Sequence, residues 1–165
     1  MLPYEVGIRI EPTHWVARRS ISTVAERMLA DSTATIHDLL AELAGAGSSA
    51  RDPVMCINGA PDANGRIAVH ACAGIEDPAP DLPTAEITEI RGGPVAWLSH
   101  TGAYEELGLA FHAVFAWIQQ HGHEVSGAMR ELYLNDPAKT PVDELVTEVM
   151  IPVVAYEGGR PSPLG

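Results

Sequence analysis

The sequence lacks most of the features that mark a secreted, membrane-bound or disulfide-bonded protein. Its 165 residues contain only two cysteines, Cys56 and Cys72, with no C-x-x-C spacing, so reduced thiols are the default expectation. No apolar run approaches the roughly 20 residues of a membrane span. The first residues, MLPYEVGIRIEP, have neither the basic start nor the apolar core of an export signal. We therefore expect a cytoplasmic protein that does not contact a membrane.

Basic residues are scarce as well. Ten Lys and Arg residues stand against 22 Asp and Glu residues, which gives a formal net charge of −12. Sequence-independent binding of nucleic acid requires a cationic surface, so we expect no direct contact with nucleic acid. The acidic surplus suits plain solubility, the binding of cations, or an acidic surface offered to a basic protein partner.

Motifs that would hold a metal, a cofactor or a catalytic nucleophile are missing too. There is no G-x-S-x-G sequence, no phosphate loop and no dinucleotide fingerprint. His121 and His123 offer two imidazoles, but two histidines without a third ligand are weak support for a metal site and fit a helix end and loop better. We expect neither a metal nor a cofactor.

What the sequence does contain is an internal repeat. At an offset of 79 residues, EVGIRIEPTHWVARRSIS lies against EITEIRGGPVAWLSHTG, and further on CINGAP lies against YLNDPA at an offset of 77. A repeat of this length indicates two copies of one supersecondary unit, because solenoids need at least three. The identical pairs include Ile8/Ile87, Val16/Val95, Ala17/Ala96, Ser20/Ser99 and Asn58/Asn135.

Each copy is predicted to form two strands, a helix and two further strands. In the first helix, which lies within residues 23–46, an apolar stripe of Ile36, Leu39, Leu40 and Leu43 follows a Thr35-x-x-Asp38 capping signal. The second helix, 104–121, carries its own apolar face and ends at Gly122. The predicted strands are residues 4–11, 14–20, 53–58, 66–73, 85–90, 95–101, 128–134 and 144–153.

These elements predict an α+β fold of duplicated ββαββ units, in which a mostly antiparallel sheet carries two main helices. A central ligand cleft is expected between the copies, because small ligands bind at the junction of two units. We predict a single domain over residues 1–154, with copies at about 4–76 and 85–153, and a disordered tail at 155–165.

One strand of the second copy raises a question about function. Glu131 and Tyr133 lie two residues apart in RELYLNDP, so they share a face of the strand while Arg130 and Leu132 face the other way. They face water if only one side of the sheet is covered, and they share an enclosed space if both sides are. The repeat aligns Glu131 with Val54 and Tyr133 with Cys56, so only the second copy carries ionisable groups there.

The second copy resembles the GyrI-like effector-binding family, whose domains are attached to multidrug-responsive transcription activators and also occur alone. The resemblance rests on the Gly-x-Tyr that opens the second helix, the tryptophan within that helix, RELYLNDP, and the closing strand TEVMIPV. VARRS, residues 16–20, is similar to the family's pattern in the first copy. The resemblance implies a duplicated fold with a ligand cleft, and a cleft glutamate at Glu131 that recognises cationic aromatic compounds.

Five further residues are candidates for the ligand site. Tyr104, Trp97, Trp117 and Trp15 could wall a cleft, although aromatic side chains are more often plain core residues. Glu148 is unusual because it stands in a strand of Val, Met and Ile; either an ion pair with Arg130 or a place in the cleft would explain it.

Three functions are compatible with the sequence. The leading hypothesis is a cytosolic protein that binds amphipathic, cationic or aromatic small molecules and thereby senses or sequesters toxic compounds. The first alternative, implied by the resemblance, is a hydrolase of strained cyclopropane-bearing electrophiles with Glu131 and Tyr133 as acid–base groups. The second is a protein that protects or inhibits DNA gyrase, or that acts with a separate regulator. No helix-turn-helix pattern adjoins the repeat, so we do not expect a complete transcription activator.

Overall fold

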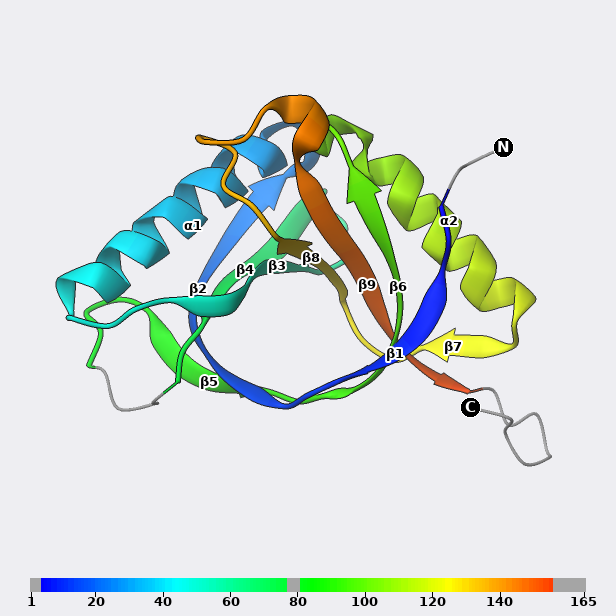
Figure 1. Cartoon of the computed structure of the whole chain (residues 1–165), viewed down its shortest axis with the longest axis horizontal. Coiled ribbons are helices and arrows are strands. Elements are labelled where there is room, and N and C mark those ends of the chain that lie inside the picture. The colour runs from blue at the N-terminus through cyan, green and yellow to red at the C-terminus, as the bar shows by residue number, and fades with distance from the viewer. Residues whose placement is uncertain (1–3, 77–80, 156–165) are drawn as a thin grey trace.

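The structure is a computed structural model that describes residues 4–76 and 81–155 (Figure 1). The predicted tail lies almost wholly outside the described residues; Ala155, its first residue, still belongs to the last strand. Within the described residues, no helix is both long and apolar enough to cross a membrane. The described chain forms one sheet of nine strands with two α-helices, which confirms the predicted α+β class.

Eight of the nine strands were predicted, with small differences at their ends. The exception is β7, which pairs with the last strand and occupies residues that the sequence suggested to be a helix end and loop. The strands are β1 (Gly7–Glu11), β2 (His14–Val24), β3 (Arg51–Asn58), β4 (Arg66–Gly74), β5 (Glu86–Ile90), β6 (Gly93–Thr101), β7 (His123–Val125), β8 (Met129–Tyr133) and β9 (Val146–Ala155).

The two copies exchange their first strands. The sheet order is β1-β6-β9-β8-β3-β4-β2-β5, so β1 pairs with β6 of the second copy and β5 pairs with β2 of the first. The central strands β3 and β8 join the copies through an antiparallel pair. The sheet curls into a half-barrel, with β1, β2 and β5 curving round its lower side in Figure 1. Neither copy can therefore complete its half of the sheet alone.

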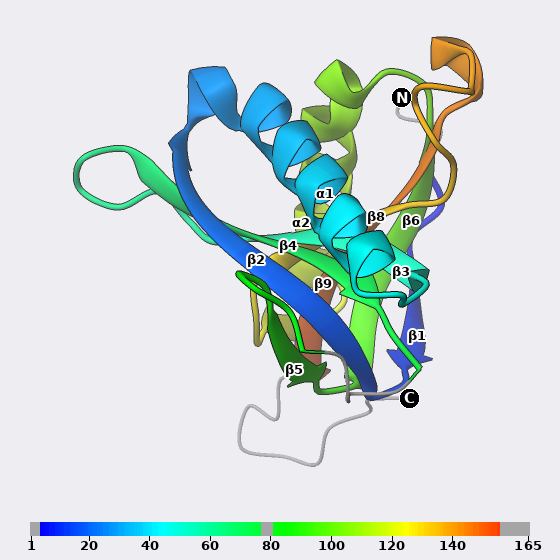
Figure 2. The same cartoon turned by 90° about the vertical axis from the view of Figure 1, so that its left-hand side faces the viewer.

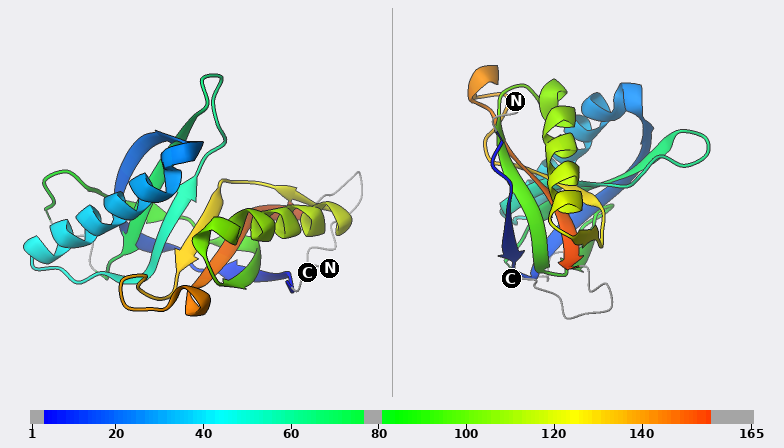
Figure 3. Two further views of the ribbon diagram at one scale, coloured as in Figure 1. Left: turned by 90° about the horizontal axis from the view of Figure 1, so that it is seen from above. Right: turned by 90° about the vertical axis from the view of Figure 1, so that its right-hand side faces the viewer.

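Both helices pack on the same face of the sheet, on either side of β3 and β8 (Figures 2 and 3). Helix α1 (Met28–Gly45) contacts β2 and β4, and α2 (Leu107–Gln120) contacts β6, β9 and β7. The predicted stripe of α1 is confirmed, because Leu39 and Leu43 are buried. The predicted helix cap is wrong: Thr35 lies inside α1, where its hydroxyl donates to the Asp31 carbonyl.

The opposite face of the sheet also carries a core, which lies inside the curl. Met55, Leu132 and Met150 point there, in alternation with residues that face the helices. Because both faces of the central strands are covered, Glu131 and Tyr133 do not face open water. The other buried members of this core are Val16, Cys72, Ile90 and Val95.

The pairing of the strands corrects the alignment of the repeat at β8. Arg18 and Trp97 are equivalent residues of the two copies, and they pair with Cys72 and Met150, so Met150 in β9 is the counterpart of Cys72 in β4. Met55 pairs with Cys72, and Arg130 pairs with Met150. Arg130 is thus the counterpart of Met55, and Glu131 is the counterpart of Cys56. The sequence alignment was two residues out of register, a shift that leaves every side chain on the same face and so left no trace in the apolar pattern.

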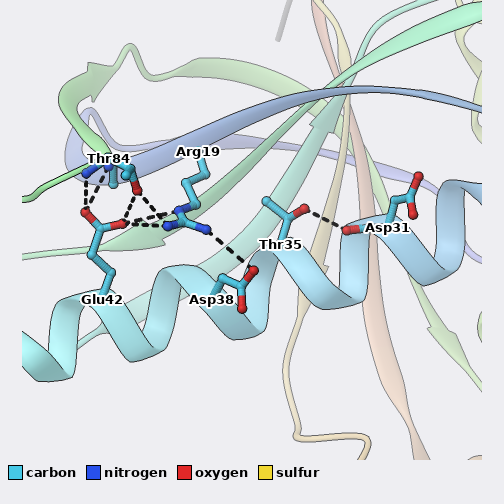
Figure 4. Close-up of polar contacts among 7 residues, drawn as sticks. Arg19, Asp31, Thr35, Asp38, Glu42 and Thr84 are labelled. Carbon is cyan, nitrogen blue, oxygen red and sulfur yellow. Dashed lines mark hydrogen bonds and ion pairs between the residues drawn. The ribbon is translucent and has the colours of Figure 1, made fainter.

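A carboxylate on α1 ties the helix to the start of the second copy (Figure 4). Glu42 accepts hydrogen bonds from the backbone N–H groups of Thr84 and Ala85 at 2.8 and 2.9 Å, and from the Thr84 hydroxyl at 2.7 Å. Arg19 on β2 donates to the same carboxylate at 3.2 Å. Burial raises the pKa of Glu42, but these donors outweigh it and lower the pKa to about 2.

Candidate functional site

Glu131 and Tyr133 interact directly on the helix-bearing face of the sheet. The Tyr133 hydroxyl donates a hydrogen bond of 2.7 Å to Oε1 of Glu131, and both side chains are half-buried. Their contact follows from the strand, since residues two apart on β8 project on the same side. This arrangement answers the question raised by RELYLNDP: the carboxylate and the phenol share an enclosed space.

Three further side chains complete this cluster. Tyr104, at the start of the 3-10 turn Tyr104–Glu106 that leads into α2, meets Tyr133 edge to face with ring centroids 5.6 Å apart. Cys56 lies directly opposite Glu131 in the β3–β8 pair, and Ser32 reaches its thiol from α1. The cluster thus draws on α1, on both central strands and on the entry to α2, so it sits where the two copies meet.

Burial raises the pKa of several groups in this cluster. It raises the pKa of Glu131, while the hydrogen bond from Tyr133 opposes that rise. Burial also raises the pKa of Tyr133 well above its ordinary value, and the thiol of Cys56 to about 12, so both stay protonated at neutral pH. Glu131 is the one member of the cluster that can carry charge near neutrality.

The carboxylate of Glu131 has no counter-charge among residues 4–76 and 81–155, where every ion pair involves other residues. The nearby charges are also negative: Asp136, followed by Glu131, raises the pKa of Tyr104 beyond the effect of burial. A half-buried carboxylate that lacks a cation and is bordered by phenol rings would gain most from a ligand that brings positive charge.

Two of the other predicted residues lie on the opposite face of the sheet. Glu148 pairs with Arg9 through two contacts of 2.7 and 3.2 Å, so its partner is Arg9 and not Arg130. Arg9 also stacks over the Trp97 ring, 4.3 Å from its centroid, and donates to Glu11 at 2.7 Å. This ion-pair cluster explains the carboxylate in an otherwise apolar strand.

The remaining two tryptophans lie away from Glu131. Trp117 stacks with both His121 and His123, with centroid distances of 4.1 and 5.6 Å, at the end of α2. Trp15, on β2, is 39% exposed. No group of three or more potential metal-binding side chains occurs within the described parts of the chain. Of the seven predicted site residues, the structure therefore brings Glu131, Tyr133 and Tyr104 together.

A pocket of about 290 Å³ opens at the end of β8. Tyr133 and Glu148 both line it, together with Glu11, His14, Val54 and Leu132. Leu132 and Glu148 lie on the face of the sheet opposite Glu131, so this pocket does not include the Glu131 carboxylate.

Comparison with known proteins identifies the family. Residues 28–154 match the model of the GyrI-like small molecule binding domain. The chain belongs to the GyrI-like family of small-molecule-binding domains. No curated protein sequence matches.

Solved structures have the same fold as this GyrI-like domain. The EcmrR C-terminal domain superimposes with a TM-score of 0.79 at 19% identity, over 94% of this chain and 100% of that one. EcmrR in its complex with DNA superimposes on 93% of this chain, with a TM-score of 0.80 at 19% identity. The present chain spans only 58% of the length of that EcmrR chain. SAV2435 bound to tetraphenylphosphonium gives a TM-score of 0.67 at 14% identity, over 91% and 94% of the two chains. A hydrolase from Listeria innocua superimposes with a TM-score of 0.61 at 13% identity, over 91% of this chain and 92% of the hydrolase.

Sequence reasoning missed Cys56 and Ser32 as members of the cluster. Cys56 was missed because the repeat alignment matched it with Tyr133; only the pairing of β3 with β8 places it opposite Glu131. Ser32 gave no such signal, since a serine within an amphipathic helix is ordinarily solvent-facing. Here it is 7% exposed and faces β3.

Proposed function

We propose that this GyrI-like domain binds amphipathic cations with aromatic groups beside Glu131, between α1 and α2, and that it serves to sense or sequester such compounds in the cytoplasm. The observation that carries the proposal is the Glu131 carboxylate, which is half-buried, receives a hydrogen bond from Tyr133 and has no ion pair within the described residues. Burial without a counter-charge is a cost that a cationic ligand removes.

The neighbours of Glu131 favour a ligand with flat apolar groups. The rings of Tyr104 and Tyr133 lie beside the carboxylate in an edge-to-face pair. Aromatic faces attract cations by about 0.5–2 kcal/mol, and more apolar area buried on the rings would add to this. A compact, strongly hydrated ion such as Na⁺ gains little from such walls. An organic cation whose charge is spread over aromatic substituents gains from both the rings and the carboxylate.

One of the structural comparisons supports the same class of ligand. SAV2435, which shares the fold, was solved with tetraphenylphosphonium, an organic cation with four phenyl groups. EcmrR, which also shares it, was solved in complex with DNA, in keeping with a domain that can be joined to a regulator. At these identities the likeness concerns the fold, so the ligand assignment for this chain rests on its own residues.

Tetraphenylphosphonium and tetraphenylborate provide a direct test because they have nearly the same shape and opposite charge. Each is titrated separately into the protein by isothermal calorimetry. We expect the phosphonium to bind through Glu131, and the Glu131→Gln substitution, which keeps the shape and an acceptor for Tyr133, to weaken it by roughly ten-fold or more. The same substitution should leave the affinity for the borate unchanged or increase it.

The matched control is Glu124→Gln, which removes the same charge from an exposed residue of β7. If both substitutions weaken the phosphonium equally, the effect is one of net charge and the site is not at Glu131. Unchanged phosphonium affinity in Glu131→Gln would refute the proposed role of this carboxylate.

Hydrolysis of strained cyclopropane-bearing electrophiles is a second candidate, which the Glu131–Tyr133 contact favours. Glu131, with its pKa raised by burial, could take a proton from water, while a phenol could return one to the opening ring. The Cys56 thiol, with a pKa of about 12, is a poor nucleophile for the same task. Mass spectrometry of a cyclopropane-bearing alkylator incubated with the protein would detect the water-added product. Equal consumption by wild type and Glu131→Gln would exclude this role.

A further inference from the structure

The turn that carries Tyr104 is fastened by a buried histidine of β6. This residue, His100, is 2% exposed. Its Nε2 atom lies 3.1 Å from the Ala103 carbonyl oxygen, and its Nδ1 atom lies 2.7 Å from the hydroxyl oxygen of Tyr4. A carbonyl oxygen can only accept, so Nε2 carries the hydrogen, and in the neutral imidazole Nδ1 then accepts from the Tyr4 hydroxyl. Tyr4 therefore favours the tautomer with which His100 holds Ala103.

Ala103 is the residue immediately before Tyr104. Its own side chain is a methyl group, which cannot cap the 3-10 turn Tyr104–Glu106. Its carbonyl oxygen accepts the backbone N–H of Glu106 at 3.1 Å in addition to the imidazole N–H, so both lone pairs of this oxygen are used. These two bonds fix the direction of the peptide group that leads into Tyr104, and with it the point from which the Tyr104 ring reaches Tyr133.

His100 lies on the same face of the sheet as Tyr133. Thr147 of β9 pairs with His100 on one side and with Tyr133 on the other, so the three residues form one row across β6, β9 and β8. Residues opposite one another in a sheet project on the same face, and neighbouring strands lie about 4.8 Å apart, which places His100 roughly 10 Å from Tyr133. The imidazole is thus close enough to act on the Glu131 cluster through Tyr104.

The first copy forms the same turn without an imidazole. The turns Ala25–Arg27 and Tyr104–Glu106 are separated by 79 residues, the offset that also relates β2 to β6. Ile21 is therefore the counterpart of His100, and Ala25 is the counterpart of Tyr104. Ile21 packs against the apolar core that α1 covers. The copy that has the buried histidine is the copy whose turn begins with an aromatic residue.

A local hydrogen bond fastens the turn of the first copy. The hydroxyl of Thr23, which is 2% exposed, donates at 2.7 Å to the carboxylate of Asp31 in the first turn of α1. The second copy has Gly102 at the position of Thr23, and it reaches for Tyr4, 96 residues before His100 in the chain. The fold can thus make this turn with a local bond, and the long-range bond of the second copy needs another explanation.

We propose that His100 and Tyr4 are positioning residues of the ligand site, which fix the ring of Tyr104 as a wall beside Glu131. This inference rests on the function proposed above, because the wall serves binding only if a ligand enters beside Glu131. A ring that is already held in place loses less conformational freedom when a flat ligand packs on it than a mobile ring does. Tyr4 precedes β1, the strand that the first copy lends to the second, so both copies contribute to the wall.

The first test needs no ligand. Tyrosine labelled with carbon-13 in the ring gives NMR signals for the four tyrosines of the chain, which single Tyr→Phe variants assign. We expect the Tyr104 signals to shift and broaden in Tyr4→Phe and in His100→Leu. They should stay near their wild-type positions in His100→Gln, because the amide N–H of glutamine can still donate to the Ala103 carbonyl oxygen.

The matched control is Thr23→Val, which removes the corresponding bond of the first copy. We expect this variant to melt at a lower temperature, as His100→Leu should, but to leave the Tyr104 signals unchanged. A change in the Tyr104 signals therefore separates a positioning role from a general loss of stability.

The second test measures the affinity for tetraphenylphosphonium. We expect His100→Leu to weaken binding by roughly two-fold to ten-fold, which is what the loss of one hydrogen bond costs. In a Tyr104→Ala background the same substitution should cause no further loss, because the ring through which His100 acts is absent.

Three results would overturn the proposal: Tyr104 signals that stay in place in both Tyr4→Phe and His100→Leu, equal movement of those signals in Thr23→Val, or an affinity loss of the same size in the Tyr104→Ala background. Tyr4→Phe, which removes a single oxygen atom, decides the matter if His100→Leu does not fold. If tetraphenylphosphonium does not bind the wild type, the proposed function fails, while the Tyr104 signals still show whether His100 positions the ring.

Discussion

Removal of the Tyr133 hydroxyl tests whether the contact with Glu131 sets the charge of the cluster. The substitution Tyr133→Phe keeps the ring that packs against Tyr104 and deletes only the donor of the 2.7 Å hydrogen bond. Burial raises the pKa of Glu131, and this hydroxyl opposes the rise. The pKa of Glu131 should therefore rise further in the variant.

The size of the effect follows from the kind of bond that is lost. A hydrogen bond to a charged group contributes about 1.5–3 kcal/mol, and each 1.4 kcal/mol is a factor of ten in an equilibrium. Loss of the donor should shift the balance between the ionised and protonated carboxyl by roughly ten-fold to a hundred-fold toward the protonated form. Cation binding needs the ionised form, so it should then require a higher pH.

The assay is the affinity for tetraphenylphosphonium measured as a function of pH. We expect the midpoint of the pH dependence to move upward in Tyr133→Phe, while the affinity on the alkaline plateau stays within a few-fold of wild type. Tyr104→Phe is the control, since no hydrogen bond joins its hydroxyl to Glu131 among the described contacts. A midpoint that does not move in Tyr133→Phe, or that moves equally in both variants, would refute the reasoning.

Two further predictions concern stability. Glu42→Gln should lower the free energy of unfolding by about 1–3 kcal/mol, because its new amide group faces the donors of Thr84. The folded pKa of Glu42, about 2, lies below its ordinary value of 4.5, so the loss measured by urea unfolding should be full above pH 4.5 and shrink as the pH falls toward 2. Gly92→Ala should destabilise strongly, because its Cβ would overlap the Glu11 carbonyl oxygen and the backbone of Pro12 and Thr13. Gly45→Ala, in open space at the end of α1, should be neutral or stabilising, and equal melting temperatures for the two alanine variants would contradict this account.

Local patterns in the sequence were enough to predict the elements and their duplication. Alternation predicted eight of the strands, and the apolar stripe of α1 predicted which side of the helix is buried, because both depend on the period of the backbone alone. The same period put Glu131 and Tyr133 on one side of β8. The start of α1 within residues 23–46 was left open by the sequence, and the Thr35-x-x-Asp38 pattern did not mark it, since a capping pattern also arises by chance within a helix.

Tertiary structure decided everything that depends on which strands become neighbours. The exchange of β1 and β5 between the copies, the choice of Arg9 as the partner of Glu148, and the meeting of Cys56 with Glu131 all join residues far apart in the chain. A two-residue slip of β8 preserves every face, so the apolar pattern could not reveal it; only hydrogen bonding to β3 and β9 selects one register. The sequence thus determined the faces on which Arg130 and Glu131 lie, and the folded sheet determined which side chains surround them, because neighbours across strands are set by pairing and not by local periodicity.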